Sequence, residues 1–110
     1  MKGKAPSLAP NKLFALRTDI DALETFEGNK TLPYRSTNKA AHLCGHDGHT
    51  TSLLGFAAKF MEKIDQIPQN RVIRLLFQPC EEGSRDSKGG AIEMIKEGAL
   101  KGVEVLRKKS

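Results

Sequence analysis

Aromatic residues are scarce in this sequence, which has no tryptophan, one tyrosine and five phenylalanines among 110 residues. So few rings exclude the stacking surface on which single-strand nucleic-acid-binding proteins hold bases. Lysine and arginine exceed aspartate and glutamate by 18 to 13, which gives a net charge of +5. These basic residues are dispersed, and only residues 107–109 form a basic run. We therefore expect a solvated basic surface and no nucleic-acid partner.

Cysteine and long apolar runs are also scarce. Two cysteines, Cys44 and Cys80, do not make a disulfide framework in a chain of this length, which favours a reducing compartment. No apolar run approaches the length needed to cross a bilayer. Residues 1–11 lack the apolar centre of a secretory signal. The expectation is a soluble, cytoplasmic protein without a membrane partner.

The length of the chain allows one domain at most, and a domain of this size buries somewhat under ~70% of the surface that its unfolded chain exposes. Residues 1–11 are rich in proline, glycine and lysine, and we expect them to form a flexible N-terminal segment. The folded domain is expected to span residues 12–110.

The hydrophobic pattern predicts alternating strands and helices. An apolar run at 13–16, followed by polar residues, indicates a buried strand that runs out into an acidic loop. A helix with one buried face is predicted over 50–67, with Met61 in the core and Pro68 as the stop. The other predicted segments are an irregular connection at 24–41, a strand covered on both faces at 72–77, a helix at 90–100 with Met94 in the core, and the start of a strand at 103–106. This order is typical of an α/β domain with a mostly parallel sheet flanked by helices.

All three histidines and one of the two cysteines lie within residues 42–49, which read HLCGHDGH. Imidazole and thiolate are ligands that suit zinc and similar divalent ions, so the cluster indicates a metal site. If the chain is extended here, alternate side chains share a face, and His42, Cys44 and His46 point the same way. The alternative is a glycine-containing loop whose histidines cap or hydrogen-bond their neighbours.

Acidic residues follow two of the predicted strands, Asp19 and Asp21 after the first, and Glu81 and Glu82 after the second. In parallel α/β sheets, ligands bind beyond the carboxyl ends of the strands. We therefore expect both acidic pairs to meet the histidine cluster at one edge of the sheet. The alternatives are that the aspartates only cap a helix or hold a loop, and that the glutamates are solvated surface acids.

A divalent ion held by Cys44 and His46 needs a further donor, for which a carboxylate is suitable. The side chains of Glu81 and Glu82 are expected to diverge at the strand end, so that one faces the metal and the other accepts a proton near the substrate. His49 and His42 are interpreted as possible hydrogen-bonding supports of the ligands. Cys80 is most simply interpreted as a small buried residue.

Three motifs together resemble those of one enzyme family. They are LRTDIDAL at 16–23, HLCGHDGHT at 42–50 and LFQPCEEG at 76–83. In order and spacing they closely resemble the metal-dependent N-acyl-amino-acid amidohydrolases, a group within the co-catalytic zinc peptidases. This group includes aminoacylases, hippurate hydrolases and the plant auxin-conjugate hydrolases. The resemblance extends from about residue 12 to residue 105.

The resemblance implies a fold like that of zinc aminopeptidases and hydrolysis of the amide bond of a small N-acyl amino acid. It implies two divalent ions in the complete enzyme, which are zinc, manganese or cobalt, and an enzyme that can form a homodimer. By position in the motifs, Cys44, His46 and Glu82 are similar to metal ligands and Glu81 to the general base. Asp21 stands where related enzymes keep an aspartate that orients a metal ligand.

Members of this family are several times longer than this chain, with two further histidine ligands downstream and an additional smaller domain. The resemblance therefore implies that residues 12–110 are a partial catalytic domain, an N-terminal fragment of such an enzyme. The alternative is a non-catalytic remnant that binds at most one metal ion or acts as an interaction module. In either case we expect an unpaired sheet edge and exposed apolar surface, and hence self-association or poor solubility.

Overall fold

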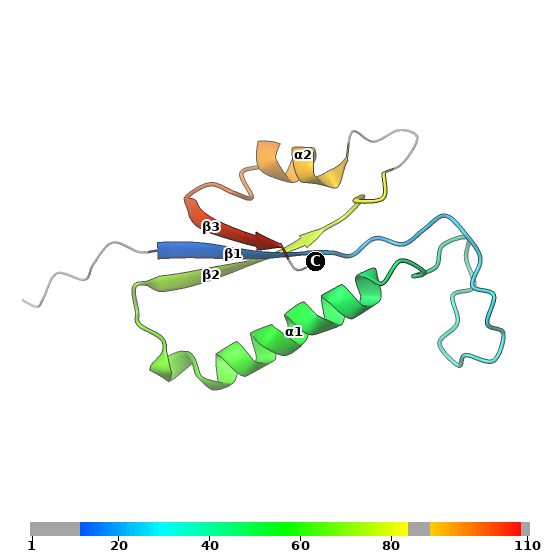
Figure 1. Cartoon of the computed structure of the whole chain (residues 1–110), viewed down its shortest axis with the longest axis horizontal. Helices are drawn as coiled ribbons and strands as arrows, with labels where there is room; N and C mark the ends of the chain where they lie inside the picture. Colours follow the sequence, from blue (N-terminus) through cyan, green and yellow to red (C-terminus); the bar gives the residue numbers. More distant parts are fainter. Residues whose placement is uncertain (1–11, 84–88, 109–110) are drawn as a thin grey trace, which may run out of the picture.

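The computed structural model describes residues 12–83 and 89–108, and the side chains of this part up to Glu104. The N-terminal segment predicted to be flexible lies outside the described residues. The elements are β1 (Lys12–Asp19), α1 (His46–Glu62), the short 3-10 helix η1 (Ile64–Gln66), β2 (Arg71–Gln78), α2 (Gly90–Lys96) and β3 (Val103–Lys108) (Figure 1). Their order confirms the predicted α/β class.

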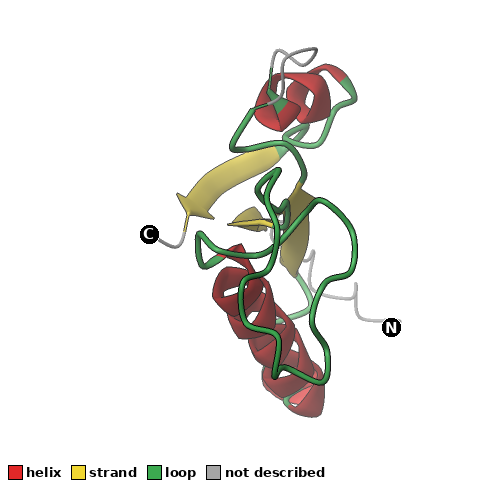
Figure 2. Cartoon of the chain, turned by 90° about the vertical axis from the view of Figure 1, so that its right-hand side faces the viewer, coloured by secondary structure: helices red, strands yellow, loops and turns green. Residues whose placement is uncertain are grey.

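The three strands form one parallel sheet in the order β2, β1, β3, so that the first strand of the chain lies in the middle. Parallel neighbours need crossover connections, and each crossover here contains a helix. Helix α1 covers one face of the sheet and α2 lies on the opposite face, as both views show (Figures 1 and 2). The pairing of β1 with β2 continues to Asp19 opposite Gln78, so the two strands end level with each other.

Strand β2 is less covered than its apolar sequence predicts. Among the described residues it pairs only with β1, Val72 is 43% exposed, and only Leu76 and Gln78 are buried along it. The prediction of a strand covered on both faces is therefore wrong. An apolar, β-branched run shows that a strand prefers to be buried, but it does not supply the neighbour that would cover it.

Both helices differ from their predicted bounds. Helix α1 begins at His46, four residues before the predicted start at Thr50, and ends at Glu62, after which η1 follows. Helix α2 ends at Lys96 rather than at Leu100. The apolar periodicity of α1 starts only at Leu53, so the polar first turn, which holds two of the histidines, gave no signal.

The apolar core of the described part is small. Its buried apolar residues are Ala15, Ala41, Leu53 and Leu76. Met61 is 63% exposed, so its prediction as a core residue is wrong, whereas Met94 is half-buried. Along α1 only His46 and Leu53 are buried, although the spacing predicted a whole buried face. Periodicity identifies the apolar side of a helix, and here little chain lies against that side.

Residues 24–40 form the predicted irregular connection. Its two ends are joined by an antiparallel bridge between Leu23 and Ala41, in which each backbone N–H donates to the other residue's carbonyl over 3.0 Å. This bridge returns the chain from the end of β1 to the start of α1, where the hydroxyl of Thr50 donates a hydrogen bond to the carbonyl of Asp19 at the strand end. None of the helices in the described ranges is long and apolar enough to span a membrane.

Candidate metal centre

Three segments meet beyond the carboxyl ends of β1 and β2, as the motif positions predicted. They are the residues after β1, the first turn of α1, and the loop after β2. His46 lies at the centre, because it opens α1 and its ring is within 4 Å of carboxylates from the other two segments. With a relative exposure of 5%, His46 is the most enclosed of the three histidines.

Asp21 holds the ring of His46 from one side. Its Oδ1 lies 3.0 Å from His46 Nδ1, and its backbone carbonyl oxygen lies 3.2 Å from the same nitrogen. Oδ1 is buried and has no hydrogen-bond partner among the described residues apart from this close contact with the ring. Two acceptors facing Nδ1 favour the tautomer with its proton there, so that Nε2 presents a lone pair.

The other nitrogen of His46 faces both glutamates. Nε2 lies 3.8 Å from Oε2 of Glu81 and 3.8 Å from Oε1 of Glu82. The expectation that the two side chains diverge is therefore wrong, and both carboxylates approach the same ring. The backbone of Cys80 has φ of 55°, and this left-handed residue turns the chain sharply after β2. The backbone N–H of Glu82 donates to Asp21 Oδ2 over 3.0 Å, which fixes the turned loop.

Cys44 completes a group of three donors. Ligand atoms of Cys44, His46 and Glu82 all lie within 4.8 Å of one another. Sulfur, nitrogen and oxygen donors at this spacing suit a divalent ion of the zinc type. A hydrogen bond to Glu82 raises the pKa of the Cys44 thiol, with smaller contributions from desolvation and from the charges of Glu82, Glu81 and Asp21. A bound cation would reverse this effect, because it stabilises the thiolate.

The extended arrangement considered for residues 42–46 is wrong. The chain bends at Cys44, Gly45 adopts a left-handed φ of 92°, and His46 already belongs to the helix. Cys44 and His46 still converge, but by this bend and not by strand alternation. His42 is exposed and belongs to neither group of potential metal donors found among the described residues.

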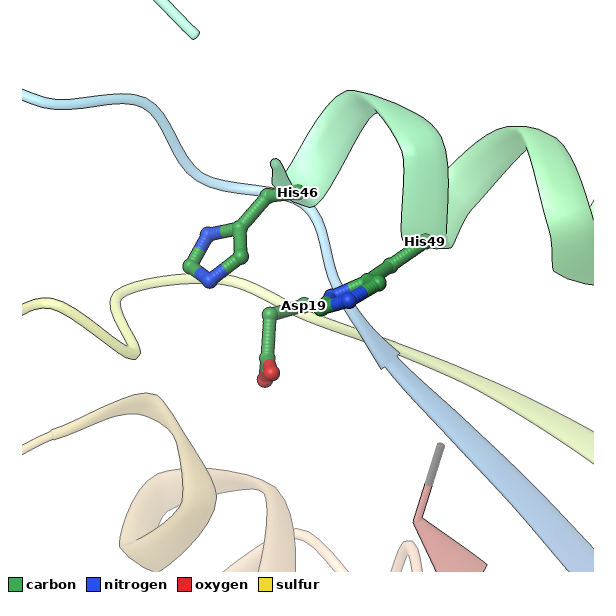
Figure 3. Close-up of side chains that lie close together, drawn as sticks. All are labelled: Asp19, His46 and His49. Carbon is green, nitrogen blue, oxygen red and sulfur yellow. The ribbon is translucent and has the colours of Figure 1, made fainter. Parts of the chain in front are cut away.

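Asp19, His46 and His49 form a second group of donors, with ligand atoms that also lie within 4.8 Å of one another (Figure 3). Asp19 is 3% exposed and pairs with Arg17 through Oδ1. The rings of His46 and His49 are 5.9 Å apart, centre to centre. Sequence reasoning expected the aspartates to meet the histidine cluster, but it did not group Asp19 with His46 and His49 in particular. The early start of α1, which sets these two histidines three residues apart on a helix, was not predicted.

An open groove of about 420 Å³ lies beside the Cys44 group. Asp21, Glu82 and Cys80 are among its lining residues. Cys80 is half-buried rather than buried, so its interpretation as a simple core residue is wrong. The turn at the end of β2 places this residue at the groove wall.

A parallel α/β sheet that gathers thiol, imidazole and carboxylate groups beyond its strand ends is typical of metal-binding α/β domains. The chain belongs to the peptidase family M20/M25/M40, whose family model matches residues 15–108. This match confirms the family resemblance that the three sequence motifs indicated.

Relatives of known sequence and structure agree with this membership. The chain is 49% identical over 89 residues to an uncharacterized hydrolase of Staphylococcus aureus strain USA300, and 47% identical over 89 residues to one from Staphylococcus haemolyticus. These alignments cover 78% of this chain and 21% of each relative.

Two solved structures are similar over 90% of this chain. One, from methicillin-resistant S. aureus, is described provisionally as an aminohydrolase and has 36% identity and a TM-score of 0.73. The other is the Bacillus subtilis YXEP protein, described as a dinuclear metal-binding peptidase of the M20 family, with 33% identity and a TM-score of 0.74. The matched parts are 25% and 26% of those chains, so this chain spans about a quarter of their length.

Proposed function

We propose that this chain supplies part of the active site of a metal-dependent hydrolase that cleaves the amide bond of N-acyl amino acids or related small amides and peptides. The observation that supports this most directly is the convergence of Cys44, His46 and Glu82 within 4.8 Å, with Glu81 beside them. The groove next to Glu82 has a volume in the range of small-molecule sites.

In this proposal Cys44, His46 and Glu82 hold a divalent metal ion, which is zinc, manganese or cobalt. The dinuclear character described for the B. subtilis relative supports two ions in the complete protein. When bound, the metal would act as a Lewis acid that polarises the substrate carbonyl and makes water an effective nucleophile near neutral pH. The remaining ligands would come from polypeptide beyond the present chain.

Glu81 acts as the general base in this proposal. Its carboxylate accepts the proton of the attacking water and returns it to the leaving amine, a role that typically contributes ~10² to 10⁴-fold. Asp21 is a positioning residue. Its contacts with His46 Nδ1 and with the backbone N–H of Glu82 orient the imidazole and the carboxylate toward each other.

We place the protein in the cytoplasm, because Cys44 and Cys80 are both free thiols and this suits a reducing compartment. The homodimer implied by the resemblance is proposed for the complete protein. The partner in catalysis is a small substrate, and neither nucleic acid nor a membrane has a role in the proposal.

A chimera tests the proposed activity. Residues 12–108 would replace the matching segment of the S. aureus hydrolase to which the chain is 49% identical, and the product would be assayed with a panel of N-acyl amino acids. We expect hydrolysis, and we expect Glu81→Gln to lower kcat by roughly 100-fold or more while the metal content stays unchanged.

Glu93→Gln is the matched control, since Glu93 is an exposed glutamate on α2 that pairs with Lys96 and belongs to neither group of potential metal donors found among the described residues. It should leave turnover unchanged. Full activity of the Glu81→Gln chimera would rule out the general-base role, and a folded, metal-loaded chimera without activity would contradict the proposed reaction.

The second candidate is a non-catalytic protein that binds at most one ion, or an interaction module. It is favoured by the fact that the two groups of potential metal donors among the described residues both include His46. Elemental analysis distinguishes the two within the chimera. A catalytic site should retain close to two ions per chain, and a remnant one or fewer.

A further inference from the structure

We propose that Asp19, His46 and His49 form a second metal position, which can hold a divalent cation such as Zn²⁺ or Co²⁺ when the Cys44 group does not. We call these three residues the Asp19 position, and Cys44, His46 and Glu82 the Cys44 position. The inference deepens the proposed function. It rests on that function in one respect only, which is that His46 is a metal ligand.

The geometry of the Asp19 position suits a cation. His46 and His49 are three residues apart in the first turn of α1, so both rings lie on one face of the helix. Asp19 is the last residue of β1, and the N-terminal end of α1 lies next to this strand end (Figure 3). Two imidazoles and one carboxylate are the ligand set of zinc sites that keep a further position open for water or substrate.

Burial and hydrogen bonding also favour a ligand there. Asp19 and His46 are 3% and 5% exposed, and Nδ1 of His49 is buried without a hydrogen-bond partner among the residues that the structure describes. Buried polar atoms nearly always have a hydrogen-bond partner. A bound cation would supply this nitrogen with the partner that it lacks among the described residues. The hydroxyl of Thr50 donates to the carbonyl of Asp19 over 3.2 Å, which ties the strand end to the helix and preforms the group.

The two positions cannot be filled together by the same nitrogen of His46. Nδ1 faces Asp21, and Nε2 offers a single lone pair, so an ion at one position excludes an ion at the other. The Cys44 position contains the carboxylate of Glu82 and has that of Glu81 beside it, whereas the Asp19 carboxylate already pairs with the guanidinium of Arg17. The Cys44 position should therefore bind more tightly, and the Asp19 position should be the alternative.

Cobalt titration of the 110-residue chain distinguishes the positions, because only the Cys44 position gives thiolate-to-cobalt charge-transfer absorption. The wild type should bind Co²⁺ with this band. The double variant Cys44→Ser, Glu82→Gln should still bind about one ion per chain, more weakly and without the band. Adding His49→Ala or Asp19→Asn to the double variant should abolish binding, and His42→Ala, which removes an exposed histidine, should not.

The results separate this inference from the proposed function. A wild type without the thiolate band would contradict the ligand role of Cys44, while residual binding that depends on His49 would still support the Asp19 position. No Co²⁺ binding by a double variant with wild-type circular dichroism would overturn the Asp19 position. So would binding that His42→Ala reduces as much as His49→Ala does. If His49→Gln alone removes the thiolate band, His49 only supports the Cys44 position and the inference fails.

Discussion

Asp21 links the parts of the site that come from different segments. It contacts the ring of His46 through Oδ1 and the backbone of Glu82 through Oδ2. One carboxylate therefore sets both a ring orientation and the position of the loop after β2. The sequence motif predicted an orienting role toward a ligand, and the contact with the loop backbone could not have been predicted, because it depends on the turn at Cys80.

The thiol of Cys44 offers a test at the residue scale. Glu82 is the largest cause of its raised pKa, so in metal-free chain the reactive thiolate is a minor species near neutral pH. We expect Glu82→Gln to lower the pKa of Cys44, and so to speed its alkylation by iodoacetamide at a fixed pH below that pKa. The pH of the half-maximal rate should move downward.

Peptide mass spectrometry measures this rate for each cysteine, and Cys80 in the same sample is the internal reference. Glu81→Gln is the graded control, since the charge of Glu81 contributes less to the pKa of Cys44 than Glu82 does. A slower reaction of Cys44 in Glu82→Gln, or an equal effect of both variants, would contradict the assignment of the hydrogen bond to Glu82.

At the scale of the elements, the sequence predicted which segments are strands and helices but not where the site falls on them. The motif order, the strand ends and the parallel sheet follow from apolar runs and turn residues. The start of α1 at His46 does not follow from them, because its first turn is polar. Its N-cap is Gly45, a left-handed glycine, which has no side chain to cap the helix. The paired histidines at 46 and 49 depend on this boundary.

Two glycines in helices should respond oppositely to alanine. A methyl group at Gly55 of α1 meets nothing within 4 Å in the described part of the chain, and alanine has the higher helix propensity, so Gly55→Ala should stabilise the fold by about 0.5 to 1 kcal/mol. A Cβ at Gly90, the first residue of α2, would lie 1.7 Å from the carbonyl oxygen of Pro79. Gly90→Ala must therefore displace α2 from the end of β2, at a cost of about 1 to 3 kcal/mol.

Urea unfolding followed by circular dichroism measures both changes under the same conditions. Each variant is the control for the other, because both add the same methyl group to a helix. If Gly90→Ala left the unfolding midpoint unchanged, the close approach of α2 to the end of β2 would be wrong.

At the scale of the whole molecule, the described part exposes much apolar surface for a small core. Leu54 and Met61 on α1 are 55% and 63% exposed, and Ile95 on α2 is 56% exposed. Hydrophobic periodicity predicted these apolar sides correctly, but only tertiary structure shows what covers them. Whether the apolar side of α1 is buried in a core therefore could not be predicted from the sequence.

This surface predicts self-association of the 110-residue chain. Leu54→Glu with Met61→Glu should shift the chain toward monomer in size-exclusion chromatography with light scattering, because it replaces exposed apolar side chains by charges. Lys59→Glu changes the net charge by the same amount on the same helix and should not have this effect. A wild-type chain that runs as a single monomer across micromolar concentrations would contradict the prediction.

The bridge between Leu23 and Ala41 has a consequence for variation in chain length. Two backbone hydrogen bonds hold the two ends of the intervening segment together. The ends of this segment therefore stay fixed whatever the length of the loop around Asn29. Doubling a flexible loop costs only about 0.6 kcal/mol in closure entropy. Homologous proteins can therefore lengthen or shorten this stretch, and an engineer can splice a peptide epitope into it, without moving His46.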